Sequence, residues 1–257
     1  MPAGAAGDIV SGADYVSQIT ALESDRRARA TFQSLVLSLA PPGGALFDFG
    51  AGPGIDARFY AERGFSVAAY DVDPQMCEYF AAHCRGLMEA GRIRLERGSY
   101  RDFLARSSVA GGRDVDLVTA NFAPLNLVDD LRGLFAAFHA LAAPNGKVLA
   151  SVLSPYFIGD LKYGWWWRNV LRLWRDGHYS VPGSQGPIVR RRLADFAAQS
   201  EPYFSLQRVF PGLPPTPPRH SRGRDATGRC AWLSTTRCLF MFLLFEKLAQ
   251  GGRAARR

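Results

Sequence analysis

The chain has 257 residues, of which 47% are hydrophobic and 21% are charged, and its formal net charge is +8. This length and composition suffice for one α/β domain with a sizeable core, so we expect a single domain over residues 1–257. The most apolar run, Cys238 to Phe245, is too short to span a bilayer. The first ten residues lack the basic and apolar regions of a targeting segment, and we expect a cytoplasmic protein.

The excess of positive charge would suit nucleic acid or an anionic membrane surface. Much of it, however, lies in the proline- and arginine-rich segment 211–229 and in the C-terminal tail, where solvated arginines are the simpler explanation. The cysteine spacing does not match the C-x-x-C of zinc sites, so we expect reduced thiols and no metal. The four cysteines are Cys77, Cys84, Cys230 and Cys238.

The N-terminal region is expected to be helical. Residues 1–12 are rich in Gly and Ala, and Tyr15 to Leu39 has the apolar spacing of one or two amphipathic helices. We expect residues 13–40 to form an N-terminal helical cap. The sequence Pro41-Pro42-Gly43-Gly44 ends this cap before the first strand.

The stretch from Leu46 to Gly54 predicts a buried strand that breaks into a glycine-rich turn before a helix at Ile55 to Arg63. Glycine reaches positive φ at little cost. Without a Cβ it also lets a ligand lie against backbone amides and the helix N-terminus. The next predicted strand, Ser66 to Ala69, is soon followed by Asp71, whose carboxylate stands where it can accept hydrogen bonds from both hydroxyls of a ribose.

Two cofactor classes share this layout, and the glycine spacing separates them. A dinucleotide fingerprint, G-x-G-x-x-G, would need a third glycine where the chain has Ile55. Pro53-Gly54 instead completes the pattern acidic-x-Gly-x-Gly-x-Gly, which begins at Asp48. This pattern continues with Asp71 and the strand Val115 to Asn121, and it resembles the class I methyltransferases that use S-adenosylmethionine.

The resemblance covers roughly residues 45–154 and implies S-adenosylmethionine as the cofactor. It also implies a Rossmann-like, doubly wound sheet of seven strands, with helices on both faces and a C-terminal antiparallel hairpin. Many relatives carry Asp where this chain has Ser99, so contact with the adenine amino group would fall to Asp102 or to backbone atoms. The cofactor-binding positions that the resemblance implies are Asp48, Gly50, Ala51, Gly52, Gly54, Asp71, Val72, Met76, Ser99, Tyr100, Asn121 and Phe122.

The middle of the chain alternates predicted helices and strands, which is typical of a doubly wound sheet. After Asp71 we expect a helix over 75–90 and a strand over 93–96. A mainly apolar strand over 115–120 leads to a helix over 127–142 and a strand over 147–153.

The second half departs from a minimal Rossmann core. Pro187 predicts the start of a helix that runs to Ala198. Strands are expected at Phe204 to Phe210 and at Arg237 to Phe245. The resemblance implies that these two strands form the antiparallel hairpin, with the last strand inserted beside the fifth and buried on both faces.

An insertion over residues 154–186 contains four of the five tryptophans. In the family the methyl acceptor usually meets this region, so we expect a lid with an aromatic wall for an apolar acceptor. Two alternatives stay open. The rings pack the lid against the core, or the segment is an interfacial helix, because arginines accompany the tryptophans. The N-terminal helices of the family often cover the cofactor, which makes Tyr15 a candidate gate. The candidate acceptor-binding residues are Tyr15, Asn126, Tyr156, Trp166, Trp167 and Tyr179.

Methyl transfer from a sulfonium requires a positioned acceptor and the exclusion of water. A general base is needed only when the nucleophile carries a proton of high pKa, and His178 is the candidate, although a surface or structural role suits it equally. We expect a small acceptor that is apolar, aromatic or lipid-like. The basic pI keeps an RNA methyltransferase as an alternative, although Asn121-Phe122-Ala123-Pro124 does not match the motif of amino-methylating enzymes. A non-catalytic subunit that binds S-adenosylmethionine is the other alternative.

Overall fold

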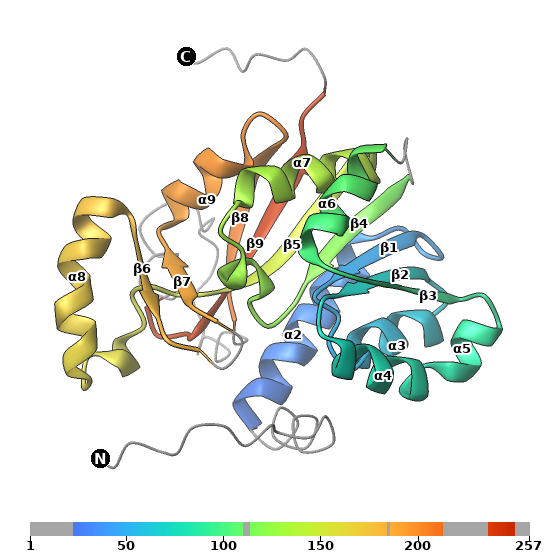
Figure 1. Cartoon of the computed structure of the whole chain (residues 1–257), viewed down its shortest axis with the longest axis horizontal. Helices are drawn as coiled ribbons and strands as arrows, with labels where there is room; N and C mark the ends of the chain where they lie inside the picture. Colours follow the sequence, from blue (N-terminus) through green and yellow to red (C-terminus); the bar gives the residue numbers. More distant parts are fainter. Residues whose placement is uncertain (1–22, 110–113, 184–185, 213–235, 250–257) are drawn as a thin grey trace, which may run out of the picture.

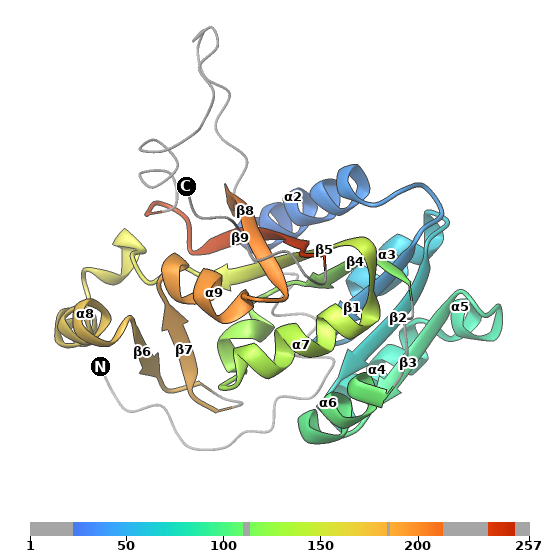
Figure 2. The ribbon, with the colours of Figure 1, turned by 90° about the horizontal axis from the view of Figure 1, so that it is seen from above.

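A computed structural model describes residues 23–109, 114–183, 186–212 and 236–249, and its elements form a central sheet with helices on both faces (Figures 1 and 2). Seven strands make up this sheet. They are β1 (Ala45–Phe49), β2 (Ser66–Asp71), β3 (Ile93–Arg97), β4 (Val115–Ala120), β5 (Ala142–Leu153), β8 (Phe204–Pro211) and β9 (Phe240–Lys247). Their order across the sheet is β3-β2-β1-β4-β5-β9-β8.

Strands β1 to β5 run parallel, whereas β9 runs antiparallel to both β5 and β8. The predicted hairpin and the insertion of the last strand beside the fifth are therefore confirmed. Strand β9 is buried along Met241 to Phe245, which explains its apolar sequence because both of its faces meet helices or core. In the part of the chain that the structure describes, no helix has the length and apolar character needed to cross a bilayer.

Two hydrophobic clusters, one on each face of the sheet, hold the helices in place. Phe32, Tyr60 and Phe80 belong to the cluster of one face, and Phe103 and Phe135 to that of the other. The first face carries α2 (Glu23–Leu39), α3 (Ile55–Glu62), α4 (Pro74–His83) and α5 (Arg85–Glu89). The second carries α6 (Tyr100–Val109), α7 (Leu131–Leu141) and α9 (Leu193–Ser200) (Figure 2).

Two predicted helices have different bounds in the structure. The helix expected over 75–90 breaks at Cys84 into α4 and α5, where the Cys84 thiol packs against the last glycine of the turn and donates to the carbonyl of Gly54 (3.6 Å). The helix expected from Leu127 begins only at Leu131. A 3-10 turn, η1 (Pro124–Leu127), precedes it, and the Asp130 carboxylate caps the helix by accepting from the backbone N–H of Gly133.

The helix predicted from Pro187 to Ala198 is wrong in its first half. Residues Ile188–Arg191 form a strand, β7, which pairs antiparallel with β6 (His178–Val181) in a small second sheet. The β-branched Ile188 and Val189 favour an extended backbone. A tertiary hydrogen bond also holds this strand, because the Asn126 amide donates to the carbonyl of Val189 (2.7 Å).

The insertion leaves the sheet at the end of β5 and contains a 3-10 turn, η2 (Ile158–Asp160), helix α8 (Gly164–Asp176) and strand β6. A buried ion pair joins Asp160 to Arg190 of β7, and the Arg190 guanidinium also donates to the carbonyl of Ser154 (3.0 Å). The ion pair therefore ties the beginning of the insertion to the strand that follows it. Helix α8 lies at one end of the molecule, beyond the small sheet (Figure 1).

Candidate functional site

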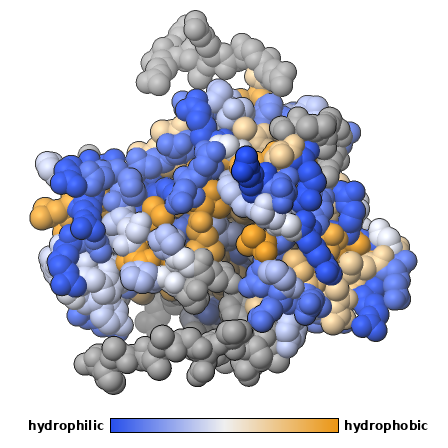
Figure 3. Space-filling view, in the orientation of Figure 1, coloured by the Kyte–Doolittle hydropathy of each residue, from blue (hydrophilic) through white to orange (hydrophobic). Residues whose placement is uncertain are grey.

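A cavity of about 390 Å³ opens at the carboxyl ends of β1, β2 and β4. This is the edge of a parallel sheet where ligands bind in open α/β folds. Figure 3 shows apolar residues at the centre of the face on which these strands end. The residues that line the cavity are Phe49, Gly50, Gly52, Tyr70, Asp71, Val72, Met76, Tyr100, Asn121, Phe122, Pro124, Leu127, Val128, Asp129 and Asp130.

The glycine-rich turn lies on the wall of this cavity, and its conformation requires glycine. Gly50 has a φ of +69°, and a Cβ built there would lie 2.7 Å from the Cβ of Pro124, so the two backbones could not approach as they do. Gly52 has a φ of +54°, and a Cβ there would meet nothing within 4 Å. The turn therefore leaves open space beside Gly52, next to the cavity.

Asp71 fixes the other side of the turn. One carboxylate oxygen accepts from the backbone N–H of Gly52 (2.7 Å) and the other from that of Asp73 (2.9 Å). Burial raises the pKa of Asp71, while these two backbone N–H groups act in the opposite direction. Asp71 lines the cavity, so the predicted ribose ligand also positions the glycine-rich turn.

Asp48, the acid at the start of the motif, is buried beneath the turn and does not line the cavity. Its carboxylate accepts from the Thr119 hydroxyl (2.8 Å). Burial, reinforced by the neighbouring charge of Asp56, raises the pKa of Asp48 to about 8. The structure thus places Asp48 as a support of the turn from within the core.

The raised pKa of Asp48 predicts a pH-dependent stability. Between about pH 4 and pH 8 the folded chain keeps a proton on Asp48 that the unfolded chain has released. The free energy of unfolding should therefore fall as the pH rises, by at most about 1.4 kcal/mol per pH unit. Asp48→Asn should remove this slope in urea unfolding measured across that range. Parallel pH profiles for the two proteins would contradict the assignment.

A buried polar network that the sequence did not reveal lies beside the turn. Asp56, in the first turn of α3, accepts from the Arg29 guanidinium, from the Gln33 amide (2.7 Å) and from the Asn121 amide (3.1 Å). The network therefore joins α2, α3 and the end of β4. The apolar periodicity of the first helix indicated only which of its faces is buried.

The chain after β4 is held in an uncommon conformation. Phe122 and Ala123 have φ values of +60° and +66°, in the left-handed region that side chains rarely adopt. Asn121 supports this turn, because its amide oxygen accepts from the N–H of Phe122 (2.9 Å) while its amide nitrogen donates to Asp56. Strained backbone of this kind persists where the surroundings determine it, and it is common at binding sites.

The far wall of the cavity is formed by α6 and the loop before α7. The Tyr100 hydroxyl donates to the carbonyl of Asp130 (3.2 Å), and burial raises the pKa of this tyrosine. Ser99 is exposed and caps α6: its hydroxyl accepts from the backbone N–H of Asp102 (3.2 Å) and donates to the Asp102 carboxylate (2.7 Å). Leu127 to Asp130 also line the cavity, although the sequence did not identify them.

None of the predicted acceptor residues that the structure describes lines this cavity. Asn126 is fully buried: its amide oxygen accepts from the N–H of Leu153 (3.0 Å), and its amide nitrogen bonds to β7. Tyr179 is buried, and its hydroxyl donates to the carbonyl of Pro155. Tyr15 lies outside the described residues. These placements leave the acceptor role of each residue a prediction.

The aromatic and basic candidates of the insertion lie nearer the surface. Tyr156 and Trp166 are partly buried, and Trp167 is 58% exposed, with its indole N–H donating to the carbonyl of Leu161 (2.9 Å). His178 is exposed at the start of β6, with Nδ1 3.0 Å from the carbonyl oxygen of Asp176. His178 as a general base stays a prediction.

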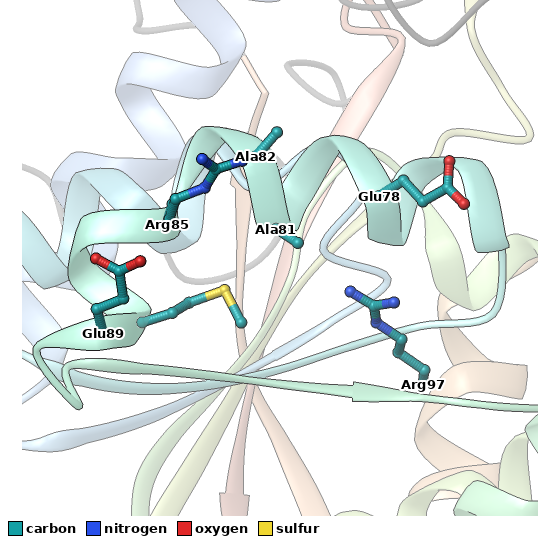
Figure 4. Close-up of a pocket in the computed structure, with 7 residues that line it drawn as sticks. Glu78, Ala81, Ala82, Arg85, Glu89 and Arg97 are labelled. Carbon is teal, nitrogen blue, oxygen red and sulfur yellow. The ribbon is translucent and has the colours of Figure 1, made fainter.

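A second hollow, of about 440 Å³, lies on the outer side of α4, α5 and β3 (Figure 4). Figure 4 shows Arg97 reaching from the strand toward the helix that carries Glu78, with Arg85 and Glu89 further along. Its walls mix carboxylates and guanidinium groups. Unlike the cavity at the strand ends, it has no glycine turn that exposes backbone amides to a ligand.

Comparison with known proteins identifies the family of this chain. The family model described as a methyltransferase domain matches residues 22–189, more than half of the chain. No curated protein sequence matches the chain.

Solved structures agree in fold. A TehB-like SAM-dependent methyltransferase from Corynebacterium glutamicum is 15% identical, with 92% of this chain and 98% of that chain covered and a TM-score of 0.55. The 1,6-didemethyltoxoflavin-N1-methyltransferase of Burkholderia thailandensis is 17% identical, with coverage of 97% and 94% and a TM-score of 0.56. A geranyl diphosphate methyltransferase is 18% identical, with coverage of 95% and 92% and a TM-score of 0.57. The chain therefore belongs to the methyltransferase domain family, within the class I superfamily that uses S-adenosylmethionine.

Proposed function

We propose that this chain transfers a methyl group from S-adenosylmethionine to a small acceptor with an apolar or aromatic part. One observation carries the proposal: the cavity at the strand ends brings together a backbone turn without side chains and the carboxylate of Asp71. Its volume of about 390 Å³ lies in the range of small-molecule and cofactor sites.

The residues of the cavity fit this cofactor. The open space beside Gly52 is a cradle that a Cβ would enter, so the backbone there is available to a ligand. Asp71 would hold the ribose hydroxyls, and Tyr100 and Met76 offer an apolar surface to a flat ring. When bound, the sulfonium supplies an activated methyl group. The residues of the chain bind, orient and exclude water, which are the tasks that such a displacement requires.

The acceptor is proposed to lie against Phe122. Its ring lines the cavity and contacts the ring of Phe240 edge to face, with centroids 5.4 Å apart. The Arg29 guanidinium lies over the Phe122 ring, 4.4 Å from its centroid. Two of the similar structures are named for small molecules, 1,6-didemethyltoxoflavin and geranyl diphosphate, which supports a small acceptor here. The insertion 154–186 as a lid and His178 as a base belong to the same proposal.

Calorimetry and a transfer assay test the proposal together. The purified chain should bind S-adenosylmethionine and S-adenosylhomocysteine but not NAD, because Ile55 stands where a dinucleotide site needs glycine. Donor with a labelled methyl group should then label one class within a panel of phenols, amines and lipids. Binding of NAD alone would contradict the cofactor assignment. Binding of the sulfonium with transfer only to RNA, or with no transfer at all, would favour the RNA enzyme or the non-catalytic subunit.

A further inference from the structure

Helix α8 presents an apolar ridge to solvent. Trp167, Leu171 and Trp174 are 58%, 71% and 81% exposed. Their spacing of i, i+4 and i+7 places them within an arc of about 60° on one side of the helix. Leu171 and Trp174 are the most exposed large hydrophobic side chains in the described part of the chain.

The opposite side of α8 attaches the helix to the rest of the insertion. Asn169 and Leu173 are buried. Trp165 stacks on Tyr163 with centroids 6.1 Å apart and approaches the buried ring of Tyr179 at 6.2 Å. This side of the helix therefore packs against the rest of the insertion, and the exposed ridge makes no contact that this packing requires.

Three more partly exposed hydrophobic side chains lie in the turn before α8. Ile158, Leu161 and Tyr163 are 42%, 38% and 45% exposed. We call these three residues, together with Trp167, Leu171 and Trp174, the α8 surface. Helix α8 lies at the end of the molecule in both ribbon views (Figures 1 and 2). Apolar and hydrophilic residues lie next to each other on the outer edge over this helix (Figure 3).

Positive charge borders the α8 surface. Arg168, Arg172 and Arg175 are all exposed and occupy the neighbouring arc of the helix, also about 60° wide. Arg175 pairs with Asp176 at the surface (2.7 Å), and Lys162 lies 5.0 Å from the centroid of Tyr163. The helix thus combines an aromatic and aliphatic ridge with a basic flank, in a chain with a net charge of +8.

We propose that the α8 surface docks on an anionic lipid bilayer. Tryptophan and tyrosine suit the boundary between headgroups and acyl chains, because each has an apolar body and a polar N–H or O–H. Arginine side chains beside such a ridge reach anionic headgroups while their stems stay in the apolar region. The helix lies along the interface and does not cross it, consistent with its 13 residues.

Charge favours lipid over a second copy of the chain as the occupant. Two copies joined through this ridge would bring the basic flank of one close to that of the other. An anionic bilayer instead offers negative charge along the full length of the helix. The proposal goes beyond methyl transfer and does not depend on the acceptor, since it concerns where the enzyme sits.

Sedimentation with vesicles tests the docking. The full chain should bind vesicles of phosphatidylcholine with phosphatidylglycerol and bind phosphatidylcholine alone at least tenfold more weakly. The double variant L171E/W174E should lose at least tenfold of the binding. The control L37E adds one negative charge, half that of the double variant, at a 39% exposed leucine of α2, and it should bind as the parent does.

A second pair of variants distinguishes the effect of the basic flank of α8 on vesicle binding from the effect of the net charge of the chain. The triple variant R168Q/R172Q/R175Q should also lose at least tenfold, whereas R26Q/R27Q/R94Q removes the same charge from exposed arginines elsewhere and should lose much less. Equal losses in the two triple variants would overturn the proposal, as would no binding to anionic vesicles. A concentration-dependent dimer that L171E/W174E abolishes would assign the ridge to a second copy. Because all of these substitutions are at exposed positions, thermal melting verifies that each variant is folded.

Discussion

Replacing Asp71 by alanine is expected to weaken the binding of S-adenosylmethionine by about 100-fold. Hydrogen bonds to a charged group are worth about 1.5–3 kcal/mol each, and 1.4 kcal/mol is a tenfold change in affinity. The variant would lose the proposed contacts to the ribose. It would also lose the bond to the N–H of Gly52 (2.7 Å), which positions the turn before any ligand arrives. Calorimetric titration of the folded variant measures the loss.

Asp116 provides a matched control for this experiment. Its carboxylate also accepts a backbone N–H from a neighbouring strand, that of Ala45 (2.8 Å), but at the amino end of β4. Asp116→Ala should therefore lower the stability of the fold and leave cofactor affinity within about twofold of the parent. If Asp71→Ala kept the affinity of the parent, Asp71 would be a support of the turn only, and the ribose would have another ligand.

Asp56→Ala should lower the free energy of unfolding by about 3 kcal/mol or more. Removing one partner of a buried ion pair leaves the other charge uncompensated, and the Arg29 side chain beside Asp56 is only 14% exposed. The same substitution leaves the amides of Gln33 and Asn121 without their acceptor. Urea unfolding measures the change.

Glu62 of the same helix is the control. It pairs with Arg58 at the surface (2.7 Å), with both side chains more than 40% exposed, and pairs of this kind contribute little. Glu62→Ala should change the free energy of unfolding by less than about 0.5 kcal/mol. Similar losses in the two variants would show that the buried network of Asp56 contributes no more to stability than a surface ion pair.

The central sheet was largely predictable because its signals are local. The mainly apolar runs at 46–49 and 115–120, the glycine turn and the helix starts each depend on a few adjacent residues. Gly50, Gly52 and Asp71 could be named for the same reason. The position of β9 came instead from the family resemblance, because pairing between distant strands leaves no mark at either strand alone.

The contacts that the sequence did not reveal are long-range. Arg29 and Asp56 are separated by 27 positions, and nothing near either residue marks the other as its partner. The same holds for β7, which a proline suggested to be helical but which the Asn126 amide holds from 63 positions away. In β7 the β-branched Ile188 and Val189 favour a strand, and the bond from Asn126 adds to that local preference.

The bonds of Asn126 and Arg191 set a limit on how this enzyme can be recombined with its relatives. Asn126 joins the loop after β4 to the end of β5 and to β7, while the Arg191 guanidinium donates to the carbonyls of Leu125 and Val128. Val128 lies on the cavity wall. A graft that exchanged only residues 154–191 for a segment without an arginine at position 191 would leave the carbonyls of Leu125 and Val128 without their donor, at about 1–3 kcal/mol for each. A chimaera must therefore exchange the insertion together with the loop over 124–130. Only then does the cavity wall at Val128 keep its bond to Arg191.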